Sequence, residues 1–254
     1  MKRRLASLLL SILFCGFGMA QSLTIYTEID APGQFYQPNG ALSGLAVEVV
    51  REIQRRTANT DRIKVVPWAR GYLELQTLPN VVLFATARTA ERNDLFKWIG
   101  PTDEKRYSLF VKADSALVLK TLEDARKLSS IGVYKDDVRD LYLTGKGFKN
   151  LDRTIDNISN VKKLMAGRIE AFAFATTGIT ELAQSAGYKA EDLKEALPFL
   201  KVQLYIAISL STPGATVKAW EKAFKDMKKD KTFERIYRKY YPLQPLPGPA
   251  ITSF

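Results

Sequence analysis

The sequence contains no histidine and only one cysteine, Cys15. Histidine is the commonest metal ligand and the usual general base near neutral pH, so catalysis by Ser-His-Asp or Cys-His groups is excluded. Enzymes that use carboxylates or lysines remain possible. We expect no metal site and no cofactor, and a single cysteine forms no disulfide within the chain.

Long apolar runs are also scarce. The apolar stretch 5–17 follows the basic residues 2–4 and precedes the small residues 18–20. This is the pattern of a secretory signal peptide, residues 1–20, so we expect a periplasmic protein. The alternative is a membrane anchor, but the run is shorter than the ~20 residues that a span requires. Bulky Phe14 precedes Cys15 where a lipidation signal has a small residue, which disfavours a lipid anchor at Cys15.

Acidic residues are outnumbered by basic ones. The chain has 38 Lys and Arg against 27 Asp and Glu, a net charge of +11. Removal of the signal takes away the three basic residues 2–4 and leaves about +8, which predicts weak attraction to anions. No basic run with interleaved aromatic residues is present, so we expect no nucleic-acid partner.

Strand-like and helix-like patterns alternate along the chain. The expected strands are 23–26, 63–66, 81–85, 107–111, 130–134, 168–175 and 202–208. The expected helices are 45–53, 71–78, 138–143, 161–166, 179–187, 217–227 and 233–240. Such alternation predicts an α/β protein with mainly parallel sheets flanked by helices. Ligands of open sheets bind beyond the carboxyl ends of the strands, so functional residues are expected in the following loops.

Five segments in order carry a resemblance to the family 3 periplasmic solute-binding proteins, the amino-acid receptors of ABC importers. They are LSGLAVEV (42–49), TAER (89–92), FKWIGP (96–101), GRIEA (167–171) and FERIYRKY (233–240). The resemblance implies a type 2 periplasmic binding fold with two lobes, two hinge crossovers and closure around a ligand. Lobe I is then 21–103 and 205–241, lobe II is 104–204, and a proline-rich tail, 242–254, runs extended. We expect a monomer.

Arg92 is the first candidate ligand-binding residue. By resemblance it holds the carboxylate of the ligand, and a guanidinium fork matches a carboxylate with two hydrogen bonds. Thr89 is expected to cap a helix that starts there and to offer its hydroxyl to the same ligand oxygen. The alternative is a surface arginine paired with a neighbouring acid. Arg88 either reads a second negative charge or pairs with a nearby acid.

Two positions depart from the amino-acid receptors. Ala87 replaces a hydroxyl residue, leaving only its backbone N–H as a donor. Ala175 stands where the family has the aspartate that binds the ligand's ammonium. Either another acid replaces it or the ligand is not an ordinary α-amino acid. Glu28 is the expected substitute, and Asp136 and Asp137 are weaker candidates, each of which alternatively caps or flanks the next helix.

Aromatic and hydroxyl residues near the loops complete the expected pocket. Trp68 is expected to lie over the ligand, and Phe35 and Tyr36 to lie near the first loop, with core packing as the alternative. Thr176 either contacts the ligand from lobe II or caps the following helix.

These residues favour a receptor that captures a small carboxylate-bearing solute, by resemblance for an ABC transporter permease. Two alternatives remain. One is an exported enzyme on the same fold, of the cyclohexadienyl or arogenate dehydratase type, with Glu28 or Glu170 as the acid. The other is a free-standing sensor that acts on a membrane partner.

Overall fold

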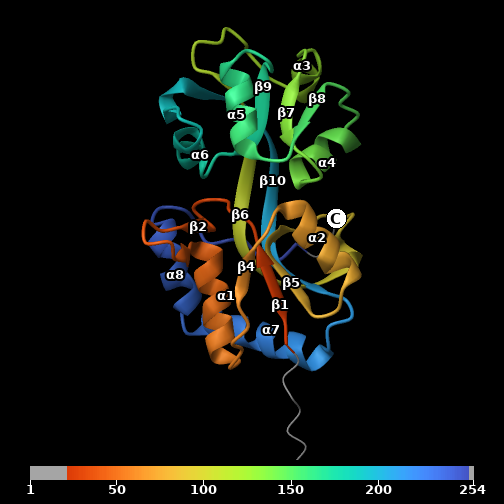
Figure 1. Cartoon of the computed structure of the whole chain (residues 1–254), viewed down its shortest axis with the longest axis vertical. Helices are drawn as coiled ribbons and strands as arrows, with labels where there is room; N and C mark the ends of the chain where they lie inside the picture. Colours follow the sequence, from red (N-terminus) through yellow and green to blue (C-terminus); the bar gives the residue numbers. More distant parts are fainter. Residues whose placement is uncertain (1–21, 252–254) are drawn as a thin grey trace, which may run out of the picture.

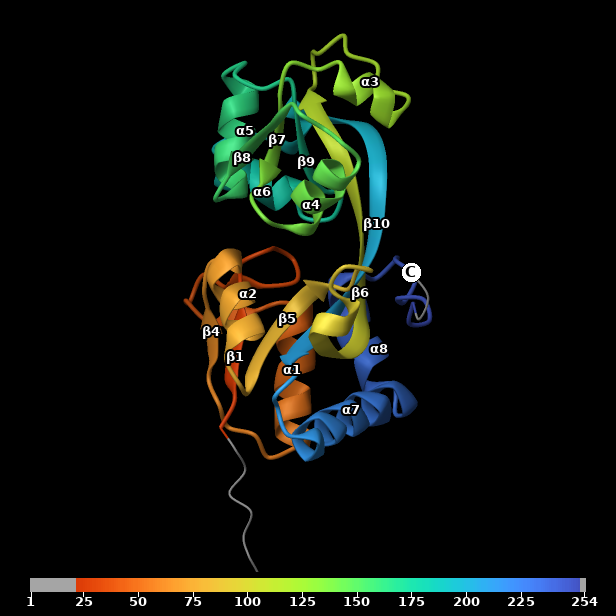
Figure 2. The ribbon, with the colours of Figure 1, turned by 90° about the vertical axis from the view of Figure 1, so that its right-hand side faces the viewer.

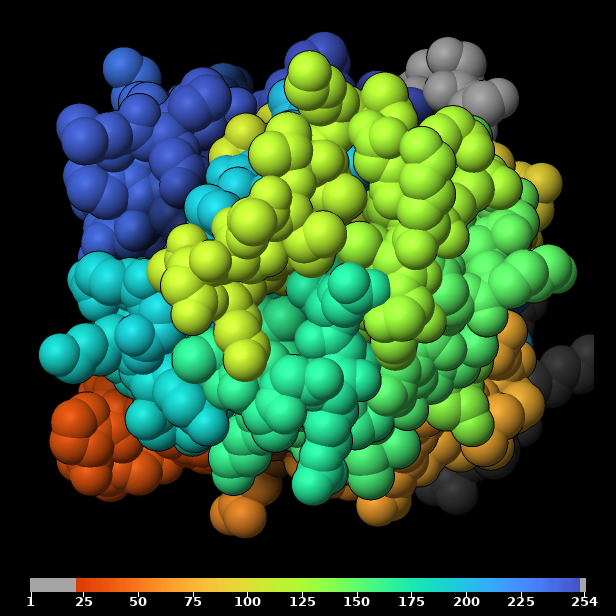
Figure 3. All heavy atoms as spheres, turned by 90° about the horizontal axis from the view of Figure 1, so that it is seen from above, coloured from red at the N-terminus to blue at the C-terminus, as the bar shows by residue number. Residues whose placement is uncertain are grey.

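The computed structural model describes residues 22–251. Figure 1 shows two lobes, one above the other, joined by two long strands. Viewed from the lobe II end, lobe II covers the middle of the molecule and parts of lobe I project beyond it (Figure 3). The expected signal peptide, with Cys15, and the last three residues of the tail lie outside the described residues.

One eight-stranded sheet runs through both lobes in the order β4-β1-β5-β10-β6-β9-β7-β8. The strands β4-β1-β5 are parallel in lobe I, and β9-β7-β8 are parallel in lobe II. Between these two groups, β10 and β6 run antiparallel to each other and to their outer neighbours. The expected fold class is therefore confirmed, with a mainly parallel group of strands in each lobe.

Lobe I contains two groups of elements from opposite ends of the chain. Its elements are β1 (Thr24–Thr27), β2 (Phe35–Tyr36), β3 (Leu42–Ser43), α1 (Leu45–Arg56), β4 (Ile63–Val65), α2 (Trp68–Thr77), β5 (Val81–Ala87), the 3₁₀ helix η1 (Asn93–Leu95), α7 (Gly214–Lys229) and α8 (Thr232–Tyr240). Helix α1 buries Leu45, Val49 and Ile53, the apolar positions at helical spacing, against the sheet and against α7 and α8.

Lobe II contains the middle of the chain. Its elements are α3 (Leu122–Arg126), β7 (Ile131–Tyr134), α4 (Val138–Gly145), β8 (Leu151–Thr154), α5 (Asn157–Met165), β9 (Ala171–Ala175), α6 (Ile179–Ser185) and the 3₁₀ helix η2 (Ala190–Asp192). Two apolar clusters form on opposite faces of its strands. Each lobe therefore has a core of its own.

The connections between the lobes are β6 (Phe96–Lys112) and β10 (Leu193–Ser209), which lie side by side in Figure 2. Each is far longer than the strand expected from the sequence. The predicted lobe boundaries, 103/104 and 204/205, fall within these two strands and stay a prediction. Lys105 of β6 is 2% exposed and forms an ion pair with Asp30 of lobe I, so a buried charge pair lies at the crossing point.

The described part of the tail, 242–251, contains neither helix nor strand. It returns to β10, where the Gln203 side chain donates to the Pro249 carbonyl (2.9 Å) and accepts from the Ile251 N–H (3.2 Å). The tail is therefore hydrogen-bonded to one of the two connecting strands. None of the described helices is long and apolar enough to cross a membrane.

Candidate functional site

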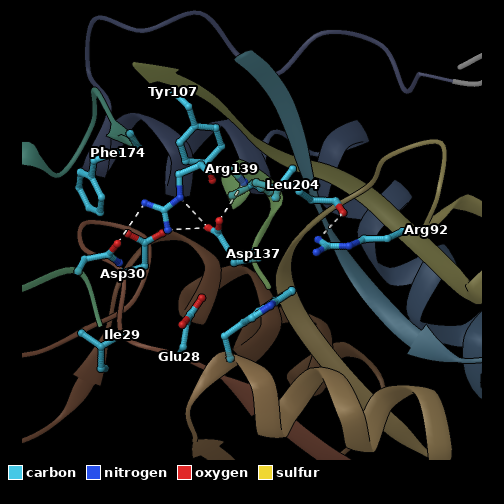
Figure 4. Close-up of a pocket in the computed structure, with 15 residues that line it drawn as sticks. Glu28, Ile29, Asp30, Arg92, Tyr107, Asp137, Arg139, Phe174 and Leu204 are labelled. Atoms are coloured by element: carbon cyan, nitrogen blue, oxygen red, sulfur yellow. Dashed lines mark hydrogen bonds and ion pairs between the residues drawn. The ribbon is translucent and has the colours of Figure 1, made fainter. Parts of the chain in front are cut away.

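A cavity of about 40 Å³ lies between the two lobes, beyond the carboxyl ends of β1, β5 and β9 (Figure 4). We call it the inner cavity. Its walls combine charged, aromatic and small residues from both lobes: Glu28, Ile29, Asp30, Trp68, Ala85, Ala87, Arg92, Tyr107, Asp137, Val138, Arg139, Asn157, Phe174, Ala175 and Leu204.

Arg92 supplies the lobe I wall with hydrogen-bond donors that have no partner. It follows β5 and precedes η1, and it is only 2% exposed. Its Nη1 donates to the Ala87 carbonyl at 3.4 Å, whereas Nε and Nη2 contact no acceptor among the described residues. Buried donors without acceptors are costly, and a guanidinium fork suits a carboxylate. The site therefore presents two buried, unpaired donors that suit an anionic group.

Two aromatic rings hold the Arg92 guanidinium in place. It lies 5.2 Å from the Trp68 ring and 4.9 Å from the Tyr72 ring, and these rings stack on each other at 5.2 Å. Trp68 begins α2 directly after Pro67, which brings its ring to the cavity. Cation–π contact fixes the guanidinium without using its N–H groups.

The lobe II wall is built around a second buried arginine, Arg139. Its Nε donates to Asp137 (2.6 Å), and its Nη1 donates to the Ala173 carbonyl (3.1 Å) and to Asn157 (3.2 Å). Burial acts to lower the pKa of Arg139, but attraction to Asp137, Tyr107 and Asp30 and the hydrogen bond to Asp137 together outweigh burial and raise it. Because Asp137 also caps α4, this pair is part of the framework of lobe II.

Glu28 follows β1 and faces both lobes. Its Oε2 accepts a hydrogen bond from the Tyr134 hydroxyl of lobe II at 3.2 Å. Burial, followed by repulsion from Asp30 and Asp137, raises the pKa of Glu28 to about 8. Near neutral pH its neutral form is favoured in this arrangement. A cation placed beside it would favour the charged form.

Contacts between the lobes enclose the cavity. The Trp68 Nε1–H of lobe I donates to the Asp136 carbonyl of lobe II at 3.2 Å. Gly178, at the start of α6, lies against the Ala31 carbonyl so closely that an added Cβ would be 2.2 Å from that oxygen. A methyl group at Gly178 is therefore incompatible with this arrangement of the lobes.

Four of the predicted site residues line the inner cavity: Glu28, Trp68, Ala87 and Arg92. Ala175, where the resemblance leads one to expect an aspartate, also lines it and is 2% exposed. No carboxylate stands at that position, as expected from the sequence.

Apart from Asp137, a weaker candidate, the other predicted residues do not line the inner cavity. Arg88 donates to Asn93 (2.9 and 2.6 Å), and its guanidinium lies over Trp98 and Tyr205. The Thr89 hydroxyl interacts with Glu91 and lowers the pKa of that carboxyl. No α-helix follows Thr89, so the expected cap does not form there.

The predicted aromatic residues other than Trp68, and the predicted lobe II residues Thr176 and Asp136, also lie away from the inner cavity. Phe35 packs edge-on against Tyr240, at 6.5 Å, and Tyr36 is 55% exposed. Thr176 lies close to the Arg106 carbonyl, 3.4 Å away. The Asp136 side chain is exposed, and that residue contributes its backbone carbonyl to Trp68.

Sequence reasoning gave no site role to Asp30, Tyr107, Arg139 or Asn157, and treated Asp137 only as a weaker candidate for the ligand's ammonium that alternatively caps the next helix. Their common signal is position, since Asp30, Asp137, Arg139 and Asn157 lie just after strands of the parallel groups. Their importance depends on burial and on partners distant in the chain. Among the described residues, no group of acidic or cysteine side chains could hold a metal ion.

A cavity between two α/β lobes that are joined by paired strands is the arrangement of a bilobed solute-binding protein. The model of one family, the bacterial extracellular solute-binding proteins, family 3, matches residues 23–243. The chain belongs to this family.

Solved structures of low sequence identity share the fold. A histidine kinase sensor domain with similarity to periplasmic binding proteins has a TM-score of 0.78 at 19% identity, covering 89% of this chain and 98% of that chain. A mutant of ArgBP from T. maritima has a TM-score of 0.76 at 19% identity, covering 87% and 95%. The ancestral amino-acid-binding protein AncCDT-1, a precursor of cyclohexadienyl dehydratase, has a TM-score of 0.70 at 20% identity, covering 87% and 95%. No curated protein matches the chain.

Proposed function

We propose that this protein is a periplasmic receptor that closes around a small carboxylate-bearing solute and delivers it to an ABC importer. The observation that carries the proposal is the pair of unsatisfied donors, Nε and Nη2 of buried Arg92, at the wall of the inner cavity. An anion there would convert two unmet donors into charge-assisted hydrogen bonds. Family membership supports the binding role, and delivery to an importer rests on the family alone.

The charge arrangement also favours a positive group on the solute. Glu28 carries a raised pKa in the absence of a cation, and among the described residues Tyr134 donates the only hydrogen bond to its carboxyl group. A ligand nitrogen beside Glu28 would favour ionisation of that carboxyl. We therefore propose that Glu28 performs the role of the aspartate that is expected at position 175, where this chain has alanine.

Calorimetric titration of the wild-type protein and of Arg92→Ala with a panel of amino acids and short peptides tests this function. We expect at least about a 30-fold loss of affinity in the variant, because truncating one partner of a buried charge pair costs about 2–5 kcal/mol. Its unfolding midpoint in urea, without ligand, should change little. Arg62→Ala, which alters an exposed arginine of the same lobe, is the control and should bind normally. Full affinity in Arg92→Ala would contradict the proposal.

One observation favours a second candidate, a dehydratase-like enzyme. Such an enzyme needs a protonated acid at its site, and Glu28 has a pKa raised to about 8. Glu170, the other acid considered, accepts a hydrogen bond from the Ser129 hydroxyl at 2.7 Å and does not line the cavity. Incubation with prephenate or arogenate separates the two candidates: product formation that disappears in Glu28→Gln indicates the enzyme, and unchanged substrate indicates the receptor.

A further inference from the structure

A second and larger cavity opens next to the inner one. Its volume is about 420 Å³, and it shares five lining residues with the inner cavity, so the two are contiguous. We call it the outer chamber. Lobe I contributes the turn after β1 and the end of β4, and lobe II contributes the loop after β8 and one side of α6.

The inner cavity and the outer chamber differ so much in volume that they would hold different parts of a ligand. A water molecule needs roughly 10–15 Å³ by this kind of measure, so the inner cavity, at about 40 Å³, holds about three water-sized groups. That is room for a carboxylate and little else. The outer chamber falls within the ~300–1,000 Å³ typical of small-molecule sites. Most of a ligand bound through Arg92 would therefore lie in the outer chamber.

The walls of the outer chamber are mainly apolar. Val65, Val66 and Ile158 line it, and at its edge Ile29 of lobe I is 46% exposed and Ile155 of lobe II is 81% exposed. No lysine or arginine within residues 22–251 lines it. Exposed aliphatic side chains on both sides of an opening favour an apolar ligand group that removes them from water.

Acidic residues lie where the two spaces meet. Glu28 and Asp30 line both of them. At this junction Asp30 is already paired with Lys105, which leaves Glu28 for a positive nitrogen. Two other acids line the outer chamber away from the junction: Asp156, whose side chain caps α5, and Glu181, which is exposed. Ala175, where the resemblance leads one to expect the aspartate that binds the ligand's ammonium, has no charge. This arrangement favours a ligand whose positive nitrogen is further from its carboxylate than in an α-amino acid.

We infer that the solute is an amino acid enlarged by an apolar group, of about dipeptide size. Its carboxylate would bind Arg92, its positive nitrogen would lie beside Glu28, and its apolar body would fill the outer chamber between Ile29 and Ile155. The inference rests on the proposed receptor function and adds the class of ligand.

Titration of the full mature protein with the twenty common amino acids and with apolar dipeptides such as L-leucyl-L-leucine tests the inference. The expected result is tighter binding of a dipeptide than of either of its constituent amino acids. Ile155→Ser should weaken dipeptide binding about tenfold, because burial of an aliphatic side chain contributes a factor of that order. Ile158→Trp, which narrows the chamber, should weaken it further. Val118→Ser changes a valine that is 72% exposed outside the chamber, and should bind as the wild type does.

The outcomes separate this inference from the receptor function. If free amino acids bind at least as tightly as dipeptides, and Ile155→Ser has no effect, the enlarged ligand is ruled out while the receptor function stands. If none of these probes binds, both are overturned. Because Ile155 is exposed, its replacement tests the chamber even if Ile158→Trp fails to fold.

Discussion

The two walls of the inner cavity each carry a buried arginine, but they use it differently. On the lobe II wall, Arg139 has acceptors for its N–H groups on Asp137, Asn157 and the Ala173 carbonyl. On the lobe I wall, Arg92 makes one long hydrogen bond and rests on two aromatic rings. A buried cation with its own partners is part of the framework, whereas one without acceptors is available to a ligand.

Under the proposed function, this difference lets one cavity serve both folding and ligand binding. The lobe II wall is already satisfied and gives the cavity a fixed surface. The lobe I wall retains two donors, Nε and Nη2 of Arg92, that have no acceptor among the described residues. Three experiments test this contrast or refine it.

The largest effect is expected from the framework arginine. Arg139→Ala leaves Asp137 buried without its partner and should lower the free energy of unfolding by about 3–5 kcal/mol. Denaturation in urea measures this. Arg55→Ala breaks an ion pair in which the arginine side chain is 70% exposed, and should cost at most ~1 kcal/mol. Equal losses in the two variants would remove the distinction between the walls.

The next effect concerns contact between the lobes. In Gly178→Ala the new methyl group meets the Ala31 carbonyl, so the lobes cannot approach fully and ligand affinity should fall about tenfold or more. Gly187→Ala is a matched control: φ is +88° there and +89° at Gly178, but no atom lies within 4 Å of the added Cβ. Both variants carry similar backbone strain, roughly 1–2 kcal/mol. Normal affinity in Gly178→Ala would show that binding does not require this approach.

The smallest effect concerns the protonation of Glu28. Because its pKa is raised to about 8, its stabilising contribution is present below pH ~4.5 and is lost as the pH rises through about 8. The ligand-free wild type should therefore lose thermal stability relative to Glu28→Gln between pH 5 and 8, by roughly a few °C per pH unit. Asp103, whose pKa is raised to about 6 by burial, is present in both proteins, so its effect on the pH dependence cancels in the comparison. Parallel melting curves against pH would contradict the assignment.

The sequence predicted the parts of the fold that depend on local pattern. Apolar periodicity located α1 and the buried strand β5, and β5 leads directly to Arg92. The length of β6 was missed because its middle, Asp103 to Arg106, is charged and looks like a loop. These residues continue the strand, and the buried Lys105 finds a partly buried partner in Asp30, 75 positions away in the chain.

The candidate site also contains residues that the local sequence predicted and residues that it did not. Glu28, Trp68 and Arg92 were identified because they follow strands and match family motifs. Arg139 was not, because its importance arises from Ala173 and Asn157, which only the folded chain brings to it. Phe35 was expected in the pocket from its position near the first loop, but α8 offers it Tyr240 as a packing partner. Partners distant in the chain decided these outcomes.

A crystal structure of the protein with its bound solute tests the central claim most directly. We expect two oxygens of one anionic group within hydrogen-bond distance, about 2.7–3.0 Å, of Arg92 Nε and Nη2, with the hydrogen bonds of Arg139 unchanged. A solute whose anionic group is bound elsewhere, with these two Arg92 nitrogens still lacking acceptors, would contradict the account.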